Sequence, residues 1–262
     1  MADAIDPAAL GAEEQSALER LILTLADSKR LMGIRYSDWI LGSPSVETGI
    51  ATSSMTQDEW GHARLLYAML KELGRDPEPV EHDRETSEYA SIAALDEEMQ
   101  DWAALVAAMA LADRAISVML ESFSRGSFEQ AQTRVPKMLA EEEFHISLGT
   151  AWYRRLAGTD GDARDLLLAA TESMLPTLVA WVGADDAPMQ LLVGAGVIGP
   201  AEERLAAYRD AIRELTALVG VDADGVEASD DWDGSRGRTA GQPSEEAASR
   251  ARGDLNRALF VE

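Results

Sequence analysis

The sequence predicts an all-α protein, and three observations support this prediction. Apolar residues recur at three- and four-residue spacings along nearly all of the 262 residues. Alternating β-branched runs are absent, and glycine or proline follows each long periodic stretch. A chain of this length can bury one large hydrophobic core. We therefore expect a helical bundle as its main body.

Four long helices are expected in the first part of the chain. The periodic stretches cover residues 12–41, 46–73, 87–124 and 128–156. The breaks that end them are Gly42-Ser43-Pro44, Gly74, Gly126 and Gly158. Long helices joined by short breaks are typical of an antiparallel bundle. The longer connection between the second and third helices fits the crossover of a ferritin-like four-helix bundle, which is the fold predicted here.

The C-terminal part is expected to add helices to this bundle. Periodic stretches cover 161–183 and 200–219, and a Gly-rich apolar patch lies between them. Residues 221–243 are rich in Asp, Gly, Ser and Arg, which indicates a surface loop or a disordered arm, and 244–259 could form a short helix. We predict a helical domain over 1–220 and an acidic, polar arm with a short helix over 221–262.

Composition narrows the possible functions. The chain has no cysteine, which excludes disulfides, iron–sulfur clusters and a cysteine nucleophile. A net charge of −24 argues against a nucleic-acid partner, because phosphate binding needs a positive face. The acidic N-terminus does not resemble a signal peptide, and charges interrupt the apolar stretches before they reach the ~20 residues of a membrane span. We expect a soluble, cytoplasmic protein without a membrane partner.

Lysine is scarce among the basic residues. Only Lys29, Lys71 and Lys137 are lysines among 23 Lys and Arg residues. An acidic surface with few lysines is typical of a halophilic protein, since high salt screens self-repulsion. A GC-rich genome that favours arginine is the alternative explanation.

Two of the three histidines belong to the same local pattern. Glu59-Trp60-Gly61-His62 lies on the second predicted helix, and Glu142-Glu143-Phe144-His145 lies on the fourth. A three-residue spacing places Glu and His on one helix face. Two such pairs in a bundle core, with one carboxylate from each remaining helix, are the usual ligands of a di-iron or di-manganese centre. A single Glu-x-x-His is common in acidic helices, but two copies on corresponding helices predict metal binding, or descent from a metal binder.

Aspartates on the other two helices complete the pattern. Asp27 and Asp113 both lie in a Leu-Ala-Asp tripeptide, 32 residues before Glu59 and 29 residues before Glu142. An ionised Asp in so apolar a helix is costly without a partner or a metal. The predicted metal ligands are Asp27, Glu59, His62, Asp113, Glu142 and His145.

These segments resemble those of a known family. Gln57 to His62 with Leu66-Tyr67, Leu111 to Asp113, and Glu141 to His145 look like the metal-binding segments of the large-subunit family of phenylacetyl-CoA epoxidase. The resemblance covers roughly residues 15–160. Chain length and the segment from Leu25 to Trp39 look more like the family's non-catalytic structural subunit, which has the same fold and a degraded metal site.

The resemblance implies an oxygenase component of a multicomponent aryl-CoA monooxygenase. A centre of two irons would activate dioxygen, with manganese as an alternative metal, and electrons would come from a separate reductase. The implied partners are a homologous large subunit, the reductase and an acyl-CoA substrate. No catalytic residue beyond the metal ligands is implied.

One ligand position does not match the family. Counted back without gaps from Glu59, the family's glutamate falls at Lys29, not at Asp27. Two residues turn a helix by about 200°, so only one of the two can face the cluster. If Lys29 faces it, the site would be a salt-bridged relic. The alternatives to a di-iron oxygenase are therefore a non-catalytic structural subunit of the same complex and a stand-alone ferritin-like oxidase.

Overall fold

The computed structural model describes residues 5–260 and confirms the predicted all-α fold. The long helices are α1 (Ala12–Asp38), α2 (Val46–Tyr67), α5 (Asp113–Arg125), α6 (Glu129–Ala157), α7 (Asp162–Val182) and α9 (Ala201–Leu218). Shorter ones are α3 (Pro77–His82), α4 (Trp102–Ala107), α8 (Ala187–Gly194), α10 (Glu245–Arg252) and α11 (Asp254–Phe260). Two short strands, β1 (Trp232–Asp233) and β2 (Arg238–Thr239), form one antiparallel hairpin.

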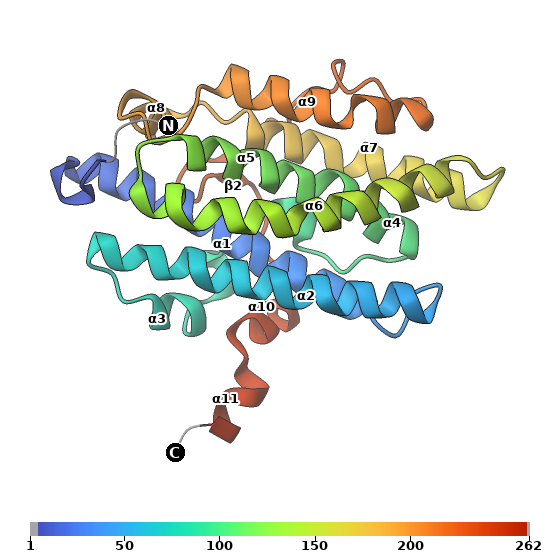
Figure 1. Ribbon diagram of the computed structural model, residues 1–262, viewed down its shortest axis with the longest axis horizontal. Coiled ribbons are helices and arrows are strands. Elements are labelled where there is room, and N and C mark those ends of the chain that lie inside the picture. Colours follow the sequence, from blue (N-terminus) through green and yellow to red (C-terminus); the bar gives the residue numbers. More distant parts are fainter. Residues whose placement is uncertain (1–4, 261–262) are drawn as a thin grey trace.

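Three layers of helices lie side by side (Figure 1). The hairpin of α1 and α2 forms one side, α5 and α6 lie in the middle, and α7 and α9 cover the far side. One continuous core of buried apolar side chains joins the layers. The bundle therefore consists of α1, α2, α5 and α6, and the C-terminal helices pack on one of its faces.

Local sequence explains several helix ends. Ser45 accepts a hydrogen bond from the backbone N–H of Thr48 at the start of α2, and Asp101 caps α4 in the same way through Ala104. Beyond α2, the chain tightens into a 3₁₀ helix over Ala68–Leu73, which ends at Gly74 in the left-handed region. Gly74 is thus the helix stop that its position in the sequence predicted.

The third predicted helix begins much later than expected. Residues 87–101 form 3₁₀ turns and extended segments, and the regular helix starts at Trp102. The backbone N–H groups of Ala90 and Ile92 donate to the side chains of Asp27 and Ser28 on α1, so this segment bonds to α1 and not to itself. Helix α3, which begins at Pro77 after its N-cap Asp76, was not predicted.

The segment after residue 220 packs on the bundle. Arg238 is fully buried, bonds to Ser91 Oγ at 3.2 Å and forms an ion pair with Asp96. Arg20 on α1 contacts Asp186 Oδ2 at 2.6 Å, and Trp232 Nε1 donates to the same oxygen at 2.9 Å. Residues 221–243 are therefore an irregular segment held to the body by polar contacts, so the alternative of a disordered arm is wrong.

Two helical stretches have the length and composition of a membrane span, contrary to the sequence-based expectation. They are Trp102–Arg125 and Asp162–Val182. In the first, 89% of the most apolar window is buried inside the protein, as in the core helix of a soluble bundle; in the second the share is 50%. One or two such helices are weak evidence for a membrane protein.

Candidate functional site

Four helices bring a buried polar cluster together at the centre of the bundle. Every member of the cluster is at most 2% exposed. The members are Lys29 on α1, Glu59 and His62 on α2, Asp113 at the start of α5, and Glu142 and His145 on α6. Five of the six predicted metal ligands therefore meet, as the two Glu-x-x-His motifs predicted.

Lys29 occupies the middle of this cluster. Its Nζ lies 2.9 Å from Glu59 Oε1, 2.8 Å from Asp113 Oδ1 and 2.7 Å from Glu142 Oε1. The ammonium donates hydrogen bonds to Glu59 and Asp113 and forms an ion pair with Glu142. Three carboxylates therefore surround the lysine.

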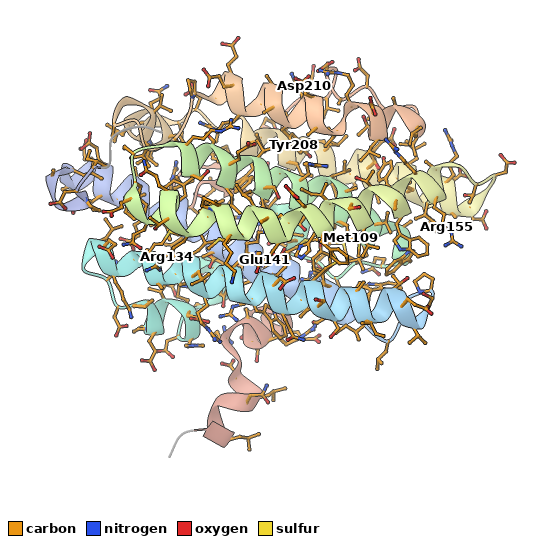
Figure 2. The ribbon with its side chains drawn as sticks, in the orientation of Figure 1. Met109, Arg134, Glu141, Arg155, Tyr208 and Asp210 are labelled. Carbon is orange, nitrogen blue, oxygen red and sulfur yellow. The ribbon has the colours of Figure 1, made fainter. Side chains whose placement is uncertain are left out.

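The two histidines bridge the cluster to half-exposed carboxylates near the surface. His145 Nδ1 lies 3.1 Å from Glu59 Oε1 and 3.3 Å from Asp113 Oδ2, while its Nε2 faces Asp58 at 3.4 Å. His62 Nδ1 lies 3.0 Å from Glu142 Oε1, and its Nε2 lies 2.8 Å from Glu141 Oε2. Glu141 lies between α6 and α2 in Figure 2. Each ring nitrogen therefore has a carboxylate beside it, although His62 Nδ1 makes no hydrogen bond.

Asp113 is positioned by an irregularity in its helix. The turn before it, Ala108–Ala112, is a π-helix, and Gly149 of α6 packs directly against that turn. A Cβ at Gly149 would lie 2.9 Å from Met109 Cβ, so only glycine allows α6 to approach this closely. Tyr36 then donates a hydrogen bond to Asp113 Oδ2 at 2.8 Å. No sequence signal had singled out Tyr36 or the π-turn.

Burial and mutual attraction shift the pKa values of the cluster. Burial alone would lower the pKa of Lys29, but Asp113, Glu142 and Glu59 raise it well above its usual value. Burial also opposes protonation of His145, yet Asp113 and Glu59 raise the pKa of His145 to about 11. Burial and the neighbouring Asp113 raise the pKa of Glu142 to about 7. Two cations therefore face three carboxylates, and the cluster is close to neutral.

Asp27 lies outside this cluster, which corrects its prediction as a metal ligand. It accepts hydrogen bonds from Tyr67 OH at 2.5 Å and from the backbone N–H of Ala90 at 2.7 Å. The guanidinium of Arg84 binds both of its oxygens, at 2.5 and 3.0 Å, and lies over the Tyr89 ring. Asp27 thus belongs to a second buried network that fastens residues 84–90 to α1.

The fold and the cluster define the class to which this protein belongs. It is a ferritin-like bundle in which two helices each supply a Glu-x-x-His pair and a third supplies an aspartate. The chain belongs to the phenylacetic acid catabolic protein family, whose sequence model matches residues 1–253. No curated protein matches the sequence. Family membership supports a role in phenylacetate catabolism.

The family implies a metal centre, and the donor set can be tested against it. One ligand atom from each of Glu59, Asp113, Glu142 and His145 lies within 4.8 Å of the others, so this set could hold a metal ion. Lys29 Nζ, however, already lies within hydrogen-bonding distance of three of these four residues. An ammonium and a metal cation compete for the same carboxylate oxygens and repel each other.

Few ligand atoms of the cluster remain free to bind a metal ion. Within the cluster, Glu59 Oε2, His62 Nδ1 and Glu142 Oε1 are buried atoms without a hydrogen-bond partner. Three such atoms are fewer than the six or so ligands that a pair of irons needs, and Glu142 Oε1 lies 2.7 Å from Lys29 Nζ. With Lys29 in its observed position, the cluster does not fit a di-iron centre. Metal binding by the five predicted ligands that meet in this cluster remains a prediction. It requires the side chain of Lys29 to turn out of the cluster.

Proposed function

We propose that this chain is the structural large subunit of a phenylacetate-degrading, multicomponent oxygenase, and that it docks a catalytic homologue without performing the oxygen chemistry. One observation carries the proposal: Lys29 Nζ contacts Glu59, Asp113 and Glu142 within 2.9 Å, where the family's catalytic members would hold metal. Family membership supports a role in phenylacetate degradation. The buried ammonium favours the structural role over the catalytic one.

The retained cluster has a structural purpose in this account. Ion pairs and hydrogen bonds of Lys29, His62 and His145 with carboxylates join α1, α2, α5 and α6 at their shared centre. Removing one partner of such a cluster leaves a buried, uncompensated charge. The carboxylates and histidines would therefore be kept for stability after the metal was lost.

A di-iron oxygenase component is the second candidate, because both Glu-x-x-His pairs are intact and four ligand atoms converge within 4.8 Å. For that function Lys29 would have to turn out of the cluster, and a separate reductase would supply electrons for oxygenation of an aryl-CoA thioester. The stand-alone oxidase is disfavoured because α7, α8 and α9 cover one face of the bundle, as an additional layer that a minimal ferritin-like unit lacks.

Reconstitution tests which role the chain has. The metal-binding homologue from the same organism and its reductase are assayed for aryl-CoA oxygenation alone, with the wild-type chain, and with the Glu59→Gln variant. We expect turnover to require this chain but to be unchanged by Glu59→Gln, because Gln keeps an acceptor for Lys29 at a position that would be a metal ligand. Loss of turnover with a folded Glu59→Gln variant would support the catalytic reading.

A further inference from the structure

The segment that crosses from α3 to α4 has a helical sequence but an irregular structure. Residues 85–125 contain no glycine or proline, and apolar positions recur at helical spacing through most of them. In the structure, helix α4 starts only at Trp102, and the crossover segment, residues 84–101, contains two short 3₁₀ helices. Its conformation departs from its local preference, which indicates that other elements hold the segment in place.

Side chains of α1 bond to the backbone of the crossover segment. Asp27 accepts a hydrogen bond from the backbone N–H of Ala90 at 2.7 Å. Arg35 donates to the carbonyl oxygens of Leu95 and Asp96 at 3.0 and 2.8 Å. In an α-helix these backbone groups would bond to residues four positions away along the chain. The contacts with α1 therefore take the place of helical hydrogen bonds.

The C-terminal strap, residues 232–252, bonds to the same segment. It comprises β1, β2 and α10. Arg238 of the strap is fully buried and forms an ion pair with Asp96. Arg252 donates a hydrogen bond to the carbonyl oxygen of Arg84 at 3.1 Å. Two further strap side chains donate to the crossover segment, Arg236 and Gln242. The crossover segment is therefore bonded by both α1 and the strap.

The strap has few apolar side chains to attach it to the body. Residues 232–252 contain no Leu, Ile, Val, Met or Phe, and their one large apolar side chain, Trp232, is partly buried. They do contain four arginines and three acidic residues, so the strap is slightly positive in a chain whose net charge is −24. It forms ion pairs with the acidic body, such as Arg250 Nη1 with Asp38 Oδ1 at 2.6 Å. Because apolar burial is the main stabilising force of a packed element, the strap should detach more easily than the helices of the bundle.

We propose that the crossover segment and the strap form one latch, which opens as a unit while α1, α2, α5 and α6 stay folded. Each part depends on the other. Without the strap, the buried Asp96 carboxylate would lose its ion pair with Arg238, and without the crossover segment Arg238 would lose that partner. Contiguous groups of contacts that open together are the usual units of local unfolding. The latch does not depend on whether the chain is the structural or the catalytic subunit.

Opening of the latch would act on one side of α1. In the closed state Asp27 is fully buried, and Arg84 and Ala90 of the crossover segment bond to it. Asp27 lies two residues before Lys29 on the same helix. Opening would expose Asp27 to water and leave Lys29 paired with carboxylates from α2, α5 and α6. The latch thus closes the side of α1 that the central cluster does not hold.

Hydrogen–deuterium exchange of the full-length chain, followed by mass spectrometry of its peptides, tests the latch in the wild type and in Arg238→Met. We expect Arg238→Met to speed exchange by about tenfold or more, and by the same factor, in peptides from residues 84–101 and 232–252. Peptides from α5 and α6 should exchange as in the wild type. The control, Arg213→Met, removes an exposed ion pair between α9 and Asp224 and should change neither region.

Unchanged exchange in Arg238→Met, or faster exchange in the strap alone, would overturn the proposal, because the crossover segment would then stay closed without the strap. An equal increase in α5 and α6 would also overturn it, since Arg238 would then support the whole fold. Asp96→Asn removes the charge but keeps an acceptor for Arg238, so we expect a smaller increase that is again matched between the two regions. This variant provides the same test if Arg238→Met does not fold.

Discussion

Asp27 and Lys29 lie two residues apart on α1 and face two different buried networks. Asp27 binds Arg84 and Tyr67, whereas Lys29 Nζ binds the carboxylates of Glu59, Asp113 and Glu142. Two residues turn an α-helix by about 200°, so one helix presents an acid to one side and a base to the other. This geometry decides which residue takes the family's ligand position.

Removing the lysine's charge is expected to destabilise the fold. In Lys29→Met the carboxylates of Glu59, Asp113 and Glu142 lose their shared cation, and breaking a buried ion pair costs about 3–5 kcal/mol. Urea unfolding followed by circular dichroism measures the change in the free energy of unfolding. Lys71→Met removes an exposed lysine and serves as the control. An equal, small effect of both substitutions would show that the cluster does not depend on Lys29.

Replacing the lysine with an acid is expected to create metal affinity. Lys29→Glu removes the competing ammonium and supplies the carboxylate that the family carries at this position, so the folded variant should bind Fe(II) or Mn(II) more tightly than the wild type. Titration calorimetry with each metal measures the gain, and Lys29→Gln, which removes the charge without adding a ligand, is the control. Equal affinity of all three chains would contradict the competition between Lys29 and a metal.

The Asp27 network is expected to act independently of the metal position. Arg84→Met leaves Asp27 buried without its bidentate partner, which should lower the free energy of unfolding by about 3–5 kcal/mol. In the Lys29→Glu background the same substitution should leave metal affinity unchanged, because Arg84 contacts Asp27 and not the central cluster. A loss of metal binding there would show that the two networks are coupled.

Much of the fold could be predicted because it depends on local signals. Periodicity gave α1, α2, α6, α7 and α9 within a few residues, and Gly74 ended the second helix as expected. The start of the third helix could not be found in this way. Residues 87–101 contain enough apolar positions for a helix, but Asp27 and Ser28 capture their backbone groups from another element. Such tertiary competition leaves no local pattern.

The site was predicted to the extent that helical spacing defines it. Two Glu-x-x-His pairs and Asp113 converge, as predicted, because residues three apart share a helix face. The repeated Leu-Ala-Asp tripeptide was misleading, since Asp27 is displaced from the matching position by about half a turn. The register count that placed Lys29 at the family's ligand position was the more reliable signal, and the structure confirms that Lys29 faces the cluster.

Acid should weaken the attachment of the C-terminal segment. Burial would raise the pKa of Asp186, but hydrogen bonds from Arg20 and Trp232 lower it below its usual value. Its contribution to stability is therefore present above the unfolded pKa of about 4 and is lost as pH falls through the lower folded value. Unfolding of Asp186→Asn and of the exposed neighbour control Asp185→Asn is measured at pH 7 and pH 3. The free energy of unfolding should differ less between pH 7 and pH 3 in Asp186→Asn than in the wild type. Asp185→Asn should show the same difference as the wild type.

Metal content per chain tests the central claim most directly. The wild-type protein is purified from iron-replete cells, incubated anaerobically with Fe(II), freed of unbound metal and analysed by mass spectrometry for iron and manganese. With Lys29 holding the three carboxylates, we predict far less than one metal ion per folded chain. About two irons per chain, lost in both His62→Ala and His145→Ala, would contradict the account and identify the chain as the catalytic component.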